Sequence, residues 1–342
     1  MVAALAAVGI AVVAGGGWAV MSLLRTPGPP GTPGIPGTRP SGTSGVQSGV
    51  ATSGGELRTV QEVLDAARTA IDQERAASAE GMLRSAVDRF PGDQRLRFML
   101  GECLLALGKG AEAYEQYDHG IMIGPDHAEY RHAAATIAAQ LGRLDEAEAH
   151  YLVAQRLAPS NPKFPLYLAQ VQRKQGKNDE ARANLVMATA LEPELAIAWG
   201  SLAALALEEN RLSVGLGYVE RARALEPTRS EWLVLEAKLL RRDNQPERAL
   251  ALLADVPVEA RVKDAALLEE MALCHGMLGR AGEAGRLYVE ALDASPERSE
   301  LAYQAAVWFE RSGERERARA FAHRARTLGH EGAAALLARV GE

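Results

Sequence analysis

The side chains that most often carry out chemistry are few in this sequence and do not form recognisable groups. None of the seven histidines lies in an HExxH pattern, and no CxxC pair occurs. His127 and His132 are five residues apart, so on a helix they would point to different sides. Glu269 and Glu270 are adjacent and do not converge on one helix face. We therefore predict neither a metal site nor a catalytic centre.

Glycine-rich loops that bind phosphate groups are also missing. No segment follows the order GxxxxGK[ST], and no GxGxxG pattern follows a strand. Lys109 lies between Gly108 and Gly110, which we interpret as a turn that ends a helix. These observations predict a protein that is not an enzyme and binds no cofactor.

Composition favours helices and removes one class of partner. The sequence is 47% hydrophobic but only 5% aromatic, with alanine and leucine most frequent among the apolar residues. This bias is typical of helices packed through small side chains. The formal net charge is -6, whereas general nucleic-acid binding needs a basic surface. We predict no nucleic-acid partner.

A 34-residue period runs through most of the sequence. Prolines recur at this spacing, and the next one in the series follows after 69 residues: Pro91, Pro125, Pro159, Pro193, Pro227 and Pro296. A small residue lies twelve positions before each of them: Ala79, Ala113, Ala147, Ala181, Gly215 and Ala284. A second small residue lies five before: Ala86, Gly120, Ala154, Ala188, Ala222 and Ala291. Such a period indicates a repeat array.

Each unit has the pattern of two amphipathic helices. In the unit from Ala128, a first apolar stripe ends at Gly142 and a second begins at Ala147. Glycine or asparagine occupies the break in most units, and both accept the left-handed backbone that ends a helix. The closing proline cannot continue the second helix. The small residues let neighbouring helices approach closely.

This pattern resembles the tetratricopeptide repeat family over about residues 60–330. The likeness includes the period, the two small positions, the closing proline, and Trp199 with Ala203 at first-helix packing positions. It implies an all-α, right-handed α-solenoid over residues 56–342. We expect eight units, starting near Val60, Gln94, Ala128, Pro162, Ala196, Ser230, Ala265 and Ser299. A helix over residues 331–340 is expected to cap the last unit.

Two local features follow from the repeat register. Cys103 and Cys274 lie five repeats apart, too far for a disulfide, so we predict two buried free thiols. In the unit from Ser230, Pro257 interrupts the second helix, which should end near Asp255 and be followed by a loop through Arg261. That interruption is either neutral variation in a tolerant turn or a change of superhelical pitch.

Two segments precede the repeats. Residues 2–24 carry no charge and would rise about 34 Å as a helix, enough for a single-pass membrane anchor, with a cleaved signal peptide as the alternative. Residues 26–55 are rich in Pro, Gly, Ser and Thr, which predicts a disordered linker; four collagen-like triplets leave a short trimerising helix as the alternative. We expect a membrane protein whose body is extracytoplasmic.

The resemblance also implies where a partner binds. In tetratricopeptide repeats, positions 2, 5, 6, 9, 12 and 13 of each unit line a concave groove. The candidate groove residues are Phe98, Met99, Glu102, Tyr167, Gln170, Arg173, Lys174, Lys238, Arg241 and Arg242. Their five basic side chains favour an acidic peptide or the C-terminus of another polypeptide, unless they pair with Glu208 and Glu209. The chaperone-tail clamp of some family members is not expected, because no unit has asparagine at position 9.

Together these features predict a membrane-tethered scaffold that binds proteins or peptides, for envelope assembly, secretion or complex biogenesis. The alternative is a structural component that self-associates through repeat edges or the collagen-like stretch and has no peptide ligand.

Overall fold

The computed structural model describes residues 50–51 and 57–341, and these form two compact units, unit 1 up to residue 175 and unit 2 from residue 176. The division falls at Gln175 and Gly176, in the turn after α8, whereas the sequence suggested one body over residues 56–342. The predicted anchor, and the linker apart from residues 50–51, lie outside the described residues. Among the described residues, no helix combines the length and apolar character needed to cross a bilayer.

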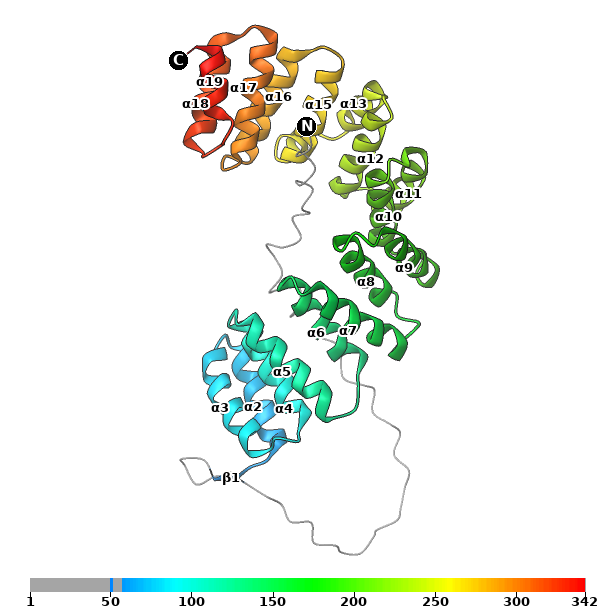
Figure 1. The fold of residues 1–342 in the computed structure, drawn as a ribbon, viewed down its shortest axis with the longest axis vertical. Coiled ribbons are helices and arrows are strands. Elements are labelled where there is room, and N and C mark those ends of the chain that lie inside the picture. Colours follow the sequence, from blue (N-terminus) through cyan, green and yellow to red (C-terminus); the bar gives the residue numbers. More distant parts are fainter. Residues whose placement is uncertain (1–49, 52–56, 342) are drawn as a thin grey trace, which may run out of the picture. The chain divides into compact units, whose positions relative to one another are not determined.

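Unit 1 consists of successive antiparallel helices (Figure 1). Its helices are α2 (Val60–Asp72), α3 (Ala76–Arg89), α4 (Gln94–Ala106), α5 (Gly110–Ile123), α6 (Ala128–Gln140), α7 (Leu144–Leu157) and α8 (Lys163–Lys174). Each packs against the next, and α2 also contacts α4. Two short strands, β1 (Val50–Ala51) and β2 (Leu57–Arg58), pair in antiparallel fashion, with Val50 opposite Arg58. No strand was expected here; two paired residues require only an extended backbone.

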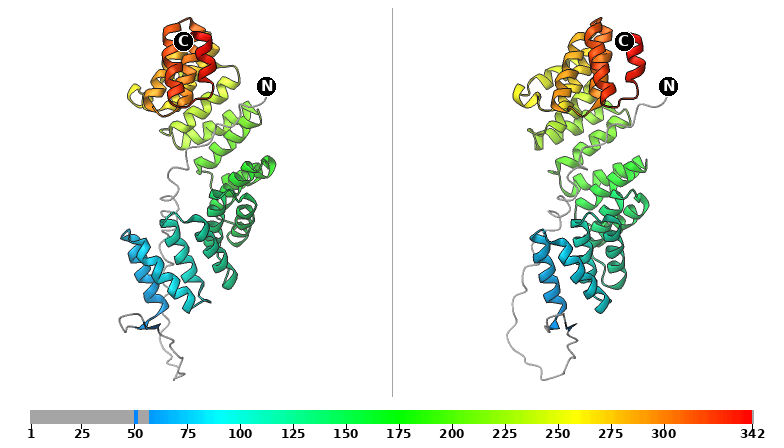
Figure 2. Two further views of the ribbon diagram at one scale, coloured as in Figure 1. Left: turned by 60° about the vertical axis from the view of Figure 1, so that its left-hand side comes forward. Right: turned by 90° about the vertical axis from the view of Figure 1, so that its left-hand side faces the viewer.

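Unit 2 continues the same alternation of first and second helices. Its helices are α9 (Asn178–Leu191), α10 (Ala196–Glu208), α11 (Leu212–Leu225), α12 (Ser230–Arg242), α13 (Pro246–Ala254), α14 (Val258–Arg261), α15 (Ala265–Met277), α16 (Ala281–Ala294), α17 (Ser299–Ser312), α18 (Arg315–Thr327) and α19 (Ala333–Val340). The last three lie side by side, so α19 covers the end of the unit (Figure 2). The predicted all-α fold of consecutive hairpins with a C-terminal capping helix is confirmed.

The turns within the hairpins share one backbone conformation. A residue with positive φ follows nearly every first helix, and it is glycine or asparagine in all but one case: Glu74, Gly108, Gly142, Gly176, Asn210, Asn244, Gly279 and Gly313. Glycine has no Cβ to clash in this region, and asparagine tolerates it. Glu74, with φ of 59°, adopts the same conformation without either advantage. The repeat register therefore fixes the turn even where the local residue does not favour it.

The irregular hairpin differs from its prediction in one detail. Its second helix, α13, ends at Ala254 as expected near Asp255. Residues 258–261, predicted as loop, form instead one helical turn, α14. Pro257 precedes it with φ of -52°, and its carbonyl accepts hydrogen bonds from the amides of Ala260 and Arg261. Proline suits this site because its missing N–H is not needed at a helix start.

Large rings lie directly over glycines of neighbouring helices. The Trp232 ring lies against Gly200, where an added Cβ would come within 2.1 Å of the indole. Trp308 covers Gly276 in the same way, and Phe98 covers Gly120. Because hard contacts of this kind cannot be compressed, Gly200 and Gly276 set the spacing between adjacent hairpins, and Gly120 sets the spacing of the two helices in its own hairpin.

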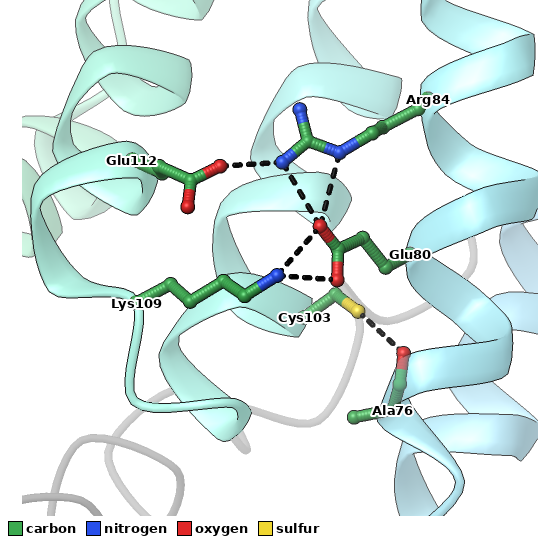
Figure 3. A network of polar contacts seen from close by, with 6 residues as sticks. All are labelled: Ala76, Glu80, Arg84, Cys103, Lys109 and Glu112. Atoms are coloured by element: carbon green, nitrogen blue, oxygen red, sulfur yellow. Dashed lines mark hydrogen bonds and ion pairs between the residues drawn. The ribbon is translucent and has the colours of Figure 1, made fainter.

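Ion pairs on the second helices join the first two hairpins (Figure 3). The Glu80 carboxylate on α3 accepts hydrogen bonds from Lys109 Nζ at 2.9 and 3.0 Å and from Arg84, which also reaches Glu112 on α5. The lysine and then the arginine lower the pKa of Glu80. Beneath them, the Cys103 thiol donates to the carbonyl of Ala76 at 3.0 Å.

Both cysteines are buried and free, as predicted. Burial raises the pKa of each thiol to about 11. At neutral pH each is therefore a protonated, poorly nucleophilic packing residue.

A half-buried histidine lies among aromatic rings in unit 1. The ring centre of His132 on α6 is 5.0 Å from that of Tyr167, 5.6 Å from Tyr151 and 5.8 Å from Phe164. Its Nε2 atom has no hydrogen-bond partner among the described residues. Burial, with a smaller effect from Lys163, lowers the pKa of His132 to about 4. The histidine therefore belongs to the core as a neutral ring.

The glycine at position 200 offers a test of the ring packing. Replacing Gly200 with alanine is expected to lower the free energy of unfolding by about 1–3 kcal/mol, because the new methyl group overlaps Trp232. Gly217, on α11, has open space at its Cβ position, so Gly217→Ala should stabilise the protein by about 0.5–1 kcal/mol. Chemical denaturation followed by circular dichroism measures both. Equal effects of the two substitutions would contradict this account.

His132 makes stability depend on pH. Its pKa is lower in the folded protein than the usual 6.5, so the unfolded protein takes up the proton first and stability falls as pH drops from 6.5 toward 4. Leucine occupies the same repeat position at Leu64 and Leu166. His132→Leu should therefore fold, and it should remove the acid-dependent loss of about 3 kcal/mol in the free energy of unfolding. The control His119→Gln, which changes an exposed histidine, should retain this pH-dependent loss of stability. Unfolding measured against pH decides; parallel profiles for parent and His132→Leu would refute the prediction.

Candidate functional site

The candidate residues belong to one repeating surface in each unit. We call the side chains at positions 2, 5, 6, 9, 12 and 13 of the first helices the first-helix face. In unit 1 these helices are α2, α4, α6 and α8, and in unit 2 they are α10, α12, α15 and α17. Within each unit the first helices pack against neighbouring helices, so the side chains on this face range from buried to exposed.

Two candidates on α4 are core residues. Phe98 is 2% exposed and Met99 is 5% exposed. The Phe98 ring stacks on Tyr130 with ring centres 3.5 Å apart and lies over Gly120. These contacts use the whole side chain, so Phe98 and Met99 hold adjacent hairpins together and offer little surface to a partner.

Glu102, on the next turn of α4, is in a different situation. Its side chain is half-buried, yet among the described residues it has no ion pair or hydrogen bond. Burial raises the pKa of this carboxyl; Arg68 lowers it and Asp72 raises it, both by longer-range interaction. A half-buried carboxylate without a partner is costly in free energy and available to bind.

The candidates on α8 form a mixed surface. Tyr167 is half-buried in the aromatic group around His132, and burial raises the pKa of its hydroxyl. Gln170 and Arg173 are also half-buried, whereas Lys174 at the end of the helix is exposed. This part of the face offers an aromatic edge, an amide and two cations.

The basic candidates of unit 2 gather around a carboxylate. Glu270 on α15 is 3% exposed, and its Oε2 atom accepts a hydrogen bond from Arg241 Nε at 2.9 Å. Lys238 Nζ lies 3.9 Å from the other oxygen. Arg242 is exposed, with only a long 3.5 Å contact from Nη2 to Asn210. Lys238 and Arg241 thus share one carboxylate, and Arg242 forms no ion pair among the described residues, so this part of α12 retains a surplus of positive charge.

The pairing differs in part from what the sequence suggested. Glu209, one of the two expected acceptors, pairs instead with Arg182 and Arg211 among the described residues. The carboxylate that does bind Arg241 is Glu270, which the sequence showed only as half of an adjacent acidic pair. Its role was hidden because its partners come from the preceding hairpin, 29 and 32 residues earlier. Comparing each first-helix acid with the residues about 29 to 32 positions earlier, slightly less than one repeat, would have found them.

Tyr130 is a further residue that sequence reasoning missed. It is half-exposed beside Glu102, and the Glu102 charge is one reason, after burial, that the pKa of its hydroxyl is raised. A signal existed in the register. Tyr130 and Trp232 both occupy position 3 of their repeats. Each ring lies against the residue at position 5 of the preceding repeat, Phe98 for Tyr130 and Gly200 for Trp232.

Other features of the described residues do not indicate catalysis. No group of three or more His, Cys, Asp or Glu side chains is placed to hold a metal ion there. An open cleft of about 500 Å³ lies at the start of α4. Turn residues and helix starts line it, including Val60, Phe90, Gln94, Ile123 and Pro125. None of the candidate groove residues is among them.

Comparisons with known proteins agree on one family. Two models described as "Tetratricopeptide repeat" match the sequence, one over residues 70–137 and one over residues 117–162 and 166–230. A comparison with curated proteins finds no match.

Solved structures with similar folds are also tetratricopeptide-like. A tetratricopeptide repeat protein from Parabacteroides merdae is 16% identical with a TM-score of 0.53, over 82% of this chain and 98% of that one. Yeast Tom70 is 19% identical with a TM-score of 0.55, over 78% of this chain and 58% of that one. The hetero-tetramer Cut9–Hcn1 is 14% identical with a TM-score of 0.52, over 83% and 56%.

Proteins of this repeat type generally act as scaffolds for protein–protein interaction. The hairpins, the left-handed turns and the family matches lead to the same result: the matched segments, residues 70–162 and 166–230, are tetratricopeptide repeats, and the other described hairpins share their fold.

Proposed function

We propose that the protein is a tethered, non-catalytic scaffold that binds protein segments on its first-helix faces. The surplus of positive charge on α12 is the observation that carries this proposal. Arg241 and Lys238 are held by buried Glu270, so their positions are fixed before a partner arrives. Fixed donors lose little conformational entropy on binding. Arg242 adds an exposed guanidinium beside them.

The chemistry of this surface suits an acidic ligand. Carboxylates of an acidic peptide, or the terminal carboxylate of another polypeptide, can accept charge-assisted hydrogen bonds from guanidinium and ammonium groups. Tyr167, Gln170, Arg173 and Lys174 on α8 offer unit 1 a second place of similar chemistry. The acidic partner therefore remains our proposal for the basic candidates.

The proposed tether comes from the sequence before the repeats. Residues 2–24 are uncharged and residues 26–55 are rich in Pro, Gly, Ser and Thr. An apolar anchor would hold the body near a bilayer, and the spacer would let the body move away from the membrane surface over the length of the spacer. We propose a body on the extracytoplasmic side, where it would gather proteins for envelope assembly, secretion or complex biogenesis.

Arg242→Glu is the sharpest test of the acidic-partner proposal. Arg241 is less suitable, because its loss would leave the buried Glu270 charge unpaired and destabilise the fold. Partners captured from detergent-solubilised membranes by the parent should bind Arg242→Glu about tenfold more weakly, since a like charge now faces their acids. Arg248→Glu, on exposed α13 surface of the same hairpin, should bind as the parent does.

Two results would count against it. Equal binding by Arg242→Glu and Arg248→Glu would remove the basic surface from the account. Light scattering of the full-length protein in detergent should give a mass that does not change with protein concentration. A mass that grows with concentration, with no captured partner, would favour the self-associating alternative.

Membrane attachment is tested by fractionation. The full-length protein should resist carbonate extraction, whereas a variant lacking residues 2–24 should become soluble, because the uncharged stretch is long enough to span about 30 Å. Protease should then be added to cells whose outer barrier has been removed and whose membrane is unbroken. It should cut the repeats if the body is extracytoplasmic. Release of the full-length protein by carbonate would show that the anchor prediction is wrong.

A further inference from the structure

A second first-helix carboxylate, Glu102 of unit 1, lacks the partners that Glu270 has in unit 2. Glu270 is bound by cations at positions 9 and 12 of the preceding first helix, Lys238 and Arg241. Glu270 is at position 6 of its repeat and Glu102 is at position 9, so the equivalent residues in the preceding repeat are Ile71 at position 12 and Glu74 at position 15. Neither of these residues is a cation, so the preceding hairpin does not give Glu102 the pairing that Glu270 has.

The remaining charges near Glu102 do not neutralise it. Arg68 is exposed and forms no ion pair with Glu102 among the described residues. Asp72, on the same helix as Arg68, opposes its effect on the Glu102 carboxyl. Two acids and one base therefore surround this point, and the local field favours an incoming positive charge.

Aromatic side chains form the wall beside the carboxylate. Tyr117 passes so close to Gly101 that an added Cβ would lie 2.7 Å from its ring, and its buried hydroxyl has no hydrogen-bond partner among the described residues. Tyr130 is half-exposed and stacks on Phe98. A half-exposed tyrosine ring next to a carboxylate offers both a π face and an ionic acceptor to a cation.

We infer that Glu102 and Tyr130 receive a lysine or arginine side chain from a bound protein segment. This inference rests on the proposed binding of segments to the first-helix faces and names the group that unit 1 selects. The cationic head meets the Glu102 carboxylate in a charge-assisted hydrogen bond. The aliphatic stem lies along Tyr130 and the half-buried side chains of Ile71 and Leu105.

The protein itself contains the precedent for this contact. On α15 the same kind of acid binds a guanidinium at 2.9 Å when the neighbouring hairpin provides one. An acidic segment would instead add a third negative charge beside Glu102 and Asp72. Glu102 on α4 and the basic residues of α12 thus select opposite charges.

Parallel peptide selection tests the inference. Random-sequence peptides displayed on phage are selected on the full-length protein, on Glu102→Gln, and on Glu115→Gln, which changes an exposed carboxylate of second helix α5. Peptides from the parent and from Glu115→Gln should carry lysine or arginine at one fixed position, and those from Glu102→Gln should not. Replacing that residue by methionine should weaken binding about tenfold to the parent and less than about twofold to Glu102→Gln.

Stability gives an independent readout. If Glu102 is a binding group without an internal partner, Glu102→Gln should unfold at no lower denaturant concentration than the parent. A clear drop would assign Glu102 a structural role and overturn the inference, as would equal enrichment of basic peptides on Glu102→Gln. Enrichment of uncharged or acidic peptides alone would overturn it while leaving segment binding intact. Failure to enrich any peptide on the parent would refute the proposed function and this inference with it.

Discussion

The structure depends on close contact between rings and helix backbone. Where Trp232 lies on Gly200, or Trp308 on Gly276, two hairpins approach until only the absence of a Cβ atom separates them from a clash. The alanines at the repeated small positions act in the same way with a smaller margin. Because each hairpin buries its apolar stripe only against its neighbours, these contacts replace the single core of a globular domain.

This arrangement decides which polar groups are left for a partner. A first-helix acid can be neutralised only by the hairpin before or after it. Glu270 pairs with Arg241 and Lys238 in that way, whereas the equivalent residues before Glu102 are Ile71 and Glu74, neither of which is a cation. Binding groups in such an array therefore arise where adjacent repeats do not match. At these positions one repeat carries a charged side chain and the neighbouring repeat has no opposite charge to pair with it.

The sequence contained most of the fold but only part of the site. The 34-residue period and the turn glycines lead directly to the hairpins, because a backbone with positive φ and a closing proline leave few alternatives. Phe98 and Met99 were placed on the binding face by position alone, yet both are buried. Their burial depends on Gly120 and Tyr130, which lie on other helices, and a position rule that treats each unit separately does not contain that information.

Opposite charge on the two faces limits what a partner can be. In unit 2, α12 has more cations than its carboxylate partner neutralises. In unit 1, the Glu102 carboxylate has no ion-pair partner among the described residues. A segment of one charge would gain at one of these two sites and lose at the other, so tight binding at both needs a partner that carries acidic and basic groups in separate stretches, or two different partners. Neutralising Glu102 and reversing Arg242 should then affect different parts of the bound protein, because each face discriminates by charge on its own.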